Sequence, residues 1–65
     1  MDYPERIKDL REGRGLSVAE VAAGAGVREA TIDAVEAGSY RPSLDLAIRI
    51  ARALGTTLDD LVGME

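Results

Sequence analysis

The chain is 65 residues long, carries a formal net charge of −4 and contains neither cysteine nor histidine. One small domain, residues 1–65, is expected, and without cysteine and histidine we expect no disulfide, no bound metal, no cofactor and no enzyme. No apolar run approaches the roughly 20 residues of a membrane span, and no signal-peptide pattern opens the chain, so the expected location is the cytoplasm.

The first helix is predicted to begin near Pro4, because proline suits a first helical turn. Ile7 and Leu10 form its apolar face, which Leu16 joins beyond the turn. Gly13 marks its end, because glycine is favoured just past a helix C-terminus.

The central stretch, residues 18–36, predicts two short helices joined by a tight turn. Ser17 is a good N-cap for the first of them, and Glu20 stands at the capping-box spacing. Gly26 suits the turn, because glycine accepts the positive φ that a sharp turn needs. Gly24 costs about 1 kcal/mol relative to alanine in a helical turn, so we expect this helix end to fray.

The second helix of this pair is predicted over residues 28–37, with Ile32 and Val35 facing the core. Helical spacing then places a mixed set of side chains on the outward face. That set is Arg28, Glu29, Ala30, Asp33 and Ala34, with Thr31 at its margin.

Two further helices are expected. Ser43 caps one that ends at Gly55. Its predicted core residues are Leu44, Ala47, Ile50, Ala51 and Leu54. Leu46 and Ile48 fall partly off this stripe, which fits either a broad buried arc or a partner surface. Thr57 caps a last short helix over residues 58–62.

The helical pair and its flanks resemble the Xre and lambda-repressor-like (phage Cro/C1-type) helix-turn-helix regulators, with the motif at about residues 18–37. The flanking blocks are IKDLREGRGLS (7–17), EAGSYRPS (36–43) and LAIRIARALGTTLDDL (46–61). The resemblance covers nearly the whole chain. It implies an all-α, five-helix domain that binds double-stranded DNA as a short stand-alone transcriptional regulator.

The resemblance also assigns roles to particular residues. It implies a largely buried ion pair between Arg11 and Glu36, where the alternative is a solvated surface arginine. It places Ser17 and Val18 at a DNA phosphate, although the family usually has glutamine where this chain has Val18. Arg41, before a proline, matches a backbone-contacting basic residue, with an exposed loop arginine as the alternative.

Base reading is implied for the outward face, at Arg28, Glu29, Ala30, Thr31, Asp33 and Ala34. Members of the family usually carry glutamine, arginine or lysine at several of these positions, whereas alanine offers only a methyl group and a carboxylate only accepts hydrogen bonds. Sparse base readout is therefore expected, with Arg28 and Thr31 as the best readers.

Two functions remain open at this stage. The first is a sequence-specific transcriptional regulator, most simply a repressor, that binds DNA as a homodimer through C-terminal residues such as Val62 and Met64. The second is a protein-interaction module, antitoxin-like or co-regulatory, that keeps the fold with weak or lost DNA binding. The acidic, alanine-rich face and the charge of −4 favour the second function.

Overall fold

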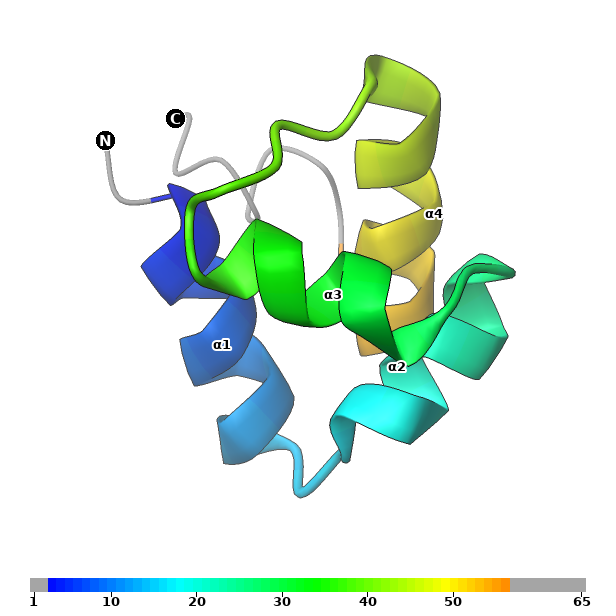
Figure 1. Ribbon diagram of the computed structural model, residues 1–65. Helices are drawn as coiled ribbons and strands as arrows, with labels where there is room; N and C mark the ends of the chain where they lie inside the picture. Colours follow the sequence, from blue (N-terminus) through cyan, green and yellow to red (C-terminus); the bar gives the residue numbers. More distant parts are fainter. Residues whose placement is uncertain (1–2, 57–65) are drawn as a thin grey trace.

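The computed structural model describes residues 3–56, and side chains from residue 5 onward. Over this range the chain forms four helices and no strand: α1 (Tyr3–Gly13), α2 (Val18–Ala25), α3 (Glu29–Glu36) and α4 (Leu44–Leu54). In Figure 1, α3 lies across the front of the other three helices. The predicted fifth helix and the predicted dimer residues Val62 and Met64 lie outside the described residues.

The helix boundaries follow from local chemistry at their ends. Both bonds of the predicted capping box form at the start of α2, where the Ser17 side chain accepts from the Glu20 N–H and the Glu20 side chain accepts from the Ser17 N–H. Ser43 caps α4 by accepting from the N–H of Leu46. Gly26 and Gly55 end α2 and α4 at φ values of +72° and +74°, a region that glycine enters without strain.

The third helix is shorter than predicted. Arg28 and Ala37 flank α3 as its N-cap and C-cap, so the helix itself runs over Glu29–Glu36. The Arg28 backbone is extended, and its side chain makes no capping hydrogen bond. Arginine has no acceptor to offer a helix N-terminus, and the side chain therefore remains in solvent beside the first turn.

The core is a single apolar cluster between the helices. α2 packs most extensively against α4, and α3 packs against α2 and α1. The largest fully buried side chains of the core are Ile7, Ile32, Ile50, Leu54, Val21 and Val35. Leu10, Leu16, Val18 and Val27 pack against this cluster from its edge. None of the described helices is long and apolar enough to cross a membrane.

One core prediction for α4, that for Leu44, was wrong, and Leu46, which the sequence left open, belongs to the broad buried arc. Leu44 is 68% exposed, whereas Leu46 is only 6% exposed and belongs to the core. Leu46 lies one helical turn before the buried Ile50, and Ile50 lies one turn before the buried Leu54, so these three residues share one face. Leu44 is the first residue of α4, off that face, and its side chain projects into solvent.

The expectation that Gly24 only weakens α2 was also incomplete. A Cβ atom placed on Gly24 would lie 2.9 Å from the Cβ of Ala53 on α4. Carbon atoms that are not bonded to each other prefer separations of about 3.5–4.0 Å. The glycine therefore lets α2 and α4 approach closely, which offsets its low helix propensity.

Candidate nucleic-acid interface

The helix-turn-helix unit is α2, the turn at Gly26 and α3. Within the turn, the N–H of Val27 donates to the carbonyl of Ala22 at 3.0 Å. Arg49 of α4 reaches the same turn and donates through Nη1 to the carbonyl of Ala25 at 3.2 Å. Its Nη2 also lies 3.0 Å from the Asp45 carboxylate. The hydrogen bond from Arg49 satisfies a backbone carbonyl at the C-terminal end of α2. The sequence does not predict this hydrogen bond, because it joins two separate helices.

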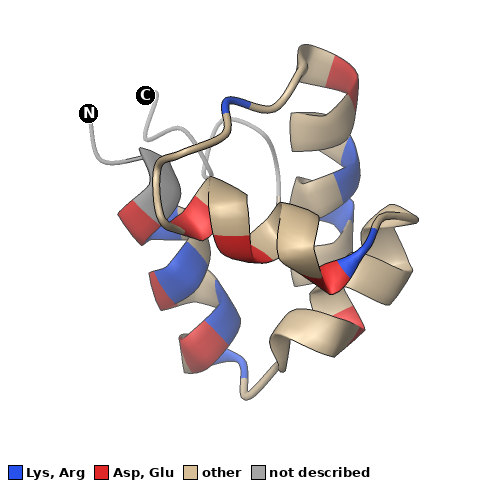
Figure 2. Ribbon diagram, in the orientation of Figure 1, with Lys and Arg blue, Asp and Glu red and all other residues tan. Residues whose placement is uncertain are grey.

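The outer face of α3 is uncovered over the described part of the chain. Glu29, Ala30 and Asp33 are exposed, and Thr31 and Ala34 are half-buried. Figure 2 shows red and tan but no blue along this helix. Four-residue spacing divides the face into an acidic flank, Glu29 and Asp33, and an apolar flank that includes Ala30 and Ala34.

The apolar flank is hollowed. Ala30, Thr31, Ala34 and Tyr40 line a shallow, open depression. The turn after α3 holds the Tyr40 backbone in place, because the Ala34 carbonyl accepts from the N–H groups of Ser39 at 3.0 Å and Tyr40 at 3.2 Å. The Ser39 hydroxyl donates to the same carbonyl at 3.2 Å. Tyr40, which is 49% exposed, thus forms one wall of the hollow.

The arginine predicted to read bases, Arg28, and the residues predicted to contact phosphates, Ser17, Val18 and Arg41, lie at the ends of α2 and α3. Arg28 lies at the start of α3 and Arg41 in the turn after it, and both are exposed. No described residue forms an ion pair with either arginine. At the start of α2, Ser17 uses its hydroxyl oxygen and its N–H in the capping box. The side chain of Val18 packs against the core, so this residue offers its backbone rather than its side chain.

The Glu20 carboxylate stabilises the start of α2 through the capping box. The backbone and hydroxyl hydrogen bonds from Ser17 lower the pKa of the Glu20 carboxyl below its ordinary value, because a hydrogen bond to the charged form favours that form. The carboxylate stays ionised at neutral pH and accepts the hydrogen bond from the Ser17 N–H in the first turn of α2.

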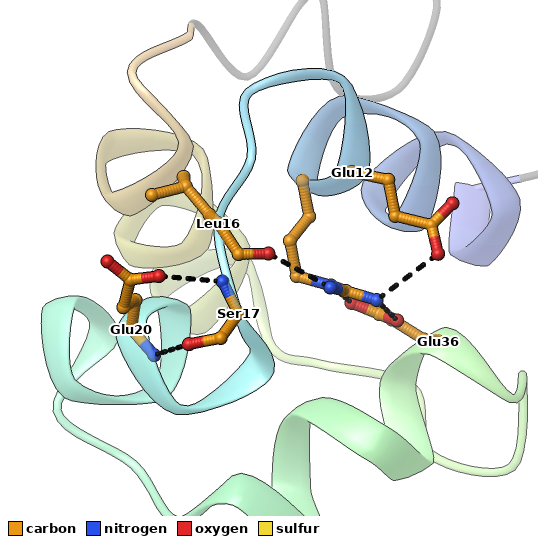
Figure 3. Close-up of polar contacts among 6 residues, drawn as sticks. Glu12, Leu16, Ser17, Glu20 and Glu36 are labelled. Atoms are coloured by element: carbon orange, nitrogen blue, oxygen red, sulfur yellow. Dashed lines mark hydrogen bonds and ion pairs between the residues drawn. The ribbon is translucent and has the colours of Figure 1, made fainter.

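The end of α3 is locked to α1 by the ion pair predicted from the resemblance. Arg11 donates from Nε to Glu36 Oε2 at 2.7 Å and from Nη2 to Glu36 Oε1 at 3.0 Å. The side chains are only 13% and 9% exposed. Arg11 Nη1 also donates to the carbonyl of Leu16 at 3.0 Å, and Glu12 lies 3.8 Å from Nη2 (Figure 3). The hydrogen bonds to Glu36 raise the pKa of Arg11.

The described residues offer no alternative site for metal chemistry. No group of three or more histidine, cysteine, aspartate or glutamate side chains gathers as a metal site over residues 3–56. The arrangement instead presents one uncovered helix, held at both ends and flanked by free guanidinium groups. Together with the fold, this places the chain in the class of helix-turn-helix domains.

Comparison with known proteins agrees with this class. The helix-turn-helix family model HTH_3 matches residues 7–61. An uncharacterised HTH-type transcriptional regulator from Archaeoglobus fulgidus is 43% identical over 56 residues, which cover 86% of this chain and 80% of that protein. The transcriptional repressor RstR of the cryptic phage CTXphi, from Vibrio cholerae, is 37% identical over 92% of this chain and 54% of its own length.

The structural likeness is equally broad. The crystal structure of the restriction-modification controller protein C.AhdI from Aeromonas hydrophila superposes with a TM-score of 0.89 at 28% identity, over 92% of this chain and 91% of that chain. The chain belongs to the helix-turn-helix family of the Xre and lambda-repressor-like type, whose members named here are regulators.

Proposed function

We propose that the chain is a sequence-specific DNA-binding transcriptional regulator that acts as a homodimer, most simply as a repressor in the cytoplasm. One observation carries the proposal: the outer face of α3 is uncovered, with Arg28 at its start and Arg41 in the turn after it. Neither arginine has an ion-pair partner among the described residues. Free guanidinium groups beside an open helix suit phosphates that flank a major groove.

The two arginines take different roles in this proposal. Arg41 contacts the sugar-phosphate backbone, and Arg28 reaches a base edge from the first turn of α3. Loss of a phosphate contact weakens binding to all sequences and lowers the salt slope by about one unit, whereas loss of a base contact costs about 1–3 kcal/mol on the preferred site only.

The test is a titration against duplex DNA selected by the protein from a random pool and against an unrelated duplex, at two salt concentrations. Arg41→Ala should weaken binding to both duplexes, and Arg28→Ala should weaken binding to the selected duplex alone. Arg52→Ala is the matched control, because Arg52 is an exposed arginine on α4 rather than beside α3. Equal losses for all three variants would show that only total charge matters.

The homodimer part of the proposal rests on the small size of the interface. One short recognition helix with few polar readers needs a second copy, because a two-fold dimer doubles the contacts and ties them to half-sites about 34 Å apart. Sedimentation with and without the selected duplex tests this. A monomer at high concentration, bound to DNA one copy at a time, would contradict the homodimer.

The acidic flank of α3 supports a second candidate, a protein-interaction module. Glu29 and Asp33 are exposed and would repel the negatively charged groove, while they would attract a basic protein partner. Glu29→Gln with Asp33→Asn discriminates between the candidates. The double variant should bind DNA more tightly if α3 enters the groove, and it should leave DNA binding absent or unchanged if the flank serves a protein partner.

A further inference from the structure

We propose that the hollow on α3, lined by Ala30, Thr31, Ala34 and Tyr40, reads the 5-methyl group of thymine in the major groove. The inference rests on the DNA-binding function proposed above and names how that site selects its sequence. On this account, methyl contacts provide the discrimination that amide and guanidinium side chains provide on a polar recognition helix.

The apolar flank of α3 offers only methyl chemistry to a base. Ala30 and Ala34 present only methyl groups, so they can discriminate between bases only through apolar contact. The thymine methyl is the apolar group on the major-groove edges of the four base pairs. An alanine-lined face in the groove can therefore distinguish thymine from cytosine, adenine and guanine, but it cannot distinguish among the other three.

The shape of the apolar flank also suits a methyl group. The alanines are not on a flat surface, because Tyr40 stands beside them as a wall. Its backbone is held by the three hydrogen bonds that the N–H groups of Ser39 and Tyr40 and the Ser39 hydroxyl donate to the Ala34 carbonyl. The alanines of the hollow have no side-chain rotamers to lose, so contact with a methyl group there costs less ordering entropy than contact through a long side chain.

Over the described part of the chain, the hollow is also free of charged side chains. Glu29 and Asp33 stand on the other flank of α3, so no carboxylate lines the hollow. A thymine methyl carries no charge and donates no hydrogen bond, and it therefore has nothing to gain from the acidic flank. The separation of the two flanks keeps Glu29 and Asp33 out of the hollow, so methyl contact there does not require a carboxylate to approach the thymine.

The experiment replaces thymine by deoxyuridine, which removes the methyl group and keeps every hydrogen-bonding group of the base. The probe is a duplex carrying the site that the protein selects from a random pool, with each thymine replaced singly. Burial of one methyl contributes about 0.8 kcal/mol, which corresponds to about a fourfold loss of affinity per contacted thymine. We expect such losses at one or two positions per half-site, with the salt slope unchanged.

A variant separates contact with the hollow from any effect of the methyl on DNA shape. In Ala34→Ser the penalty for deoxyuridine at the contacted position should shrink, because effects of groups in direct contact are not additive. Ala23→Ser, at an exposed alanine of α2, is the matched control and should keep the full penalty. Circular dichroism of both variants shows that the fold is retained.

The possible outcomes are distinct. If the selected site binds equally well with thymine and with deoxyuridine, or contains no recurrent thymine, the methyl inference fails while the DNA-binding function stands. If the penalty is the same in the wild type and in Ala34→Ser, the hollow is not the reader. If no duplex shows salt-dependent binding, the proposed function itself fails.

Discussion

Replacing Gly24 by alanine should destabilise the domain, although helix propensity alone predicts the opposite. Alanine gains about 1 kcal/mol over glycine in a helix interior. The new Cβ would lie 2.9 Å from the Cβ and 3.5 Å from the Cα of Ala53. A Cβ atom cannot turn aside as the end of a long side chain can, so α2 and α4 must separate.

Overpacking of this kind costs about 1–3 kcal/mol. After the gain in helix propensity is subtracted, the net loss is about 1 kcal/mol, which lowers the melting temperature of a domain this small by about 4–8 °C. Thermal unfolding followed by circular dichroism measures the difference. Adding Ala53→Gly to Gly24→Ala should restore most of the stability, because it removes the methyl that the new one meets.

Gly13→Ala is the matched control. Gly13 is also helical and has nothing within 4 Å of an added Cβ, so its melting temperature should stay unchanged or rise. If Gly24→Ala raised the melting temperature as Gly13→Ala does, the close approach of α2 and α4 would not explain this glycine.

Three further predictions concern stability. Glu36→Gln should cost about 3 kcal/mol in urea unfolding, because it strips the charged partner from a largely buried Arg11; an unchanged midpoint would contradict this. Glu20 has a lowered pKa in the folded state, so its contribution is present above its unfolded pKa and is lost as the pH falls through the folded value. Glu20→Gln can still complete a capping box, so its melting temperature should fall less than that of the wild type between about pH 5 and pH 3. An equal fall in the two proteins would refute the assignment. Leu46→Ala should cost about 2–5 kcal/mol, whereas Leu44→Ala, at an exposed position, should change stability by no more than about 0.5 kcal/mol.

The sequence predicts well what is decided locally. Ser17 and Glu20 form their capping box because both partners lie within one helical turn. Gly26 and Gly55 end their helices because the backbone there needs a positive φ. The Arg11–Glu36 pair spans 25 positions and came from the family resemblance rather than from spacing.

The features that the sequence does not predict depend on how the helices pack against one another. The close contact of Gly24 with Ala53 and the hydrogen bond from Arg49 to the Ala25 carbonyl each join α2 to α4. Periodicity along a single helix carries no information about either. The same holds for the hollow, because Tyr40 reaches Ala34 through a turn whose path depends on backbone hydrogen bonds.

The core prediction for Leu44 was wrong for a related reason. Both are apolar and both lie in the first turn of α4, so the helical period alone fits several stripes. Only the direction from which α2 packs decides which leucine is covered.

We expect the outer face of α3 to enter the major groove of DNA. Amide chemical-shift mapping of the labelled protein with the selected duplex tests it most directly, because each backbone amide reports its own surroundings. We expect the largest changes in amide chemical shift between Arg28 and Ala34, with a second group at Arg41 and the start of α2. If the protein saturated with the duplex showed its largest chemical-shift changes on the outer surfaces of α1 or α4, and none on α3, this would contradict the expectation.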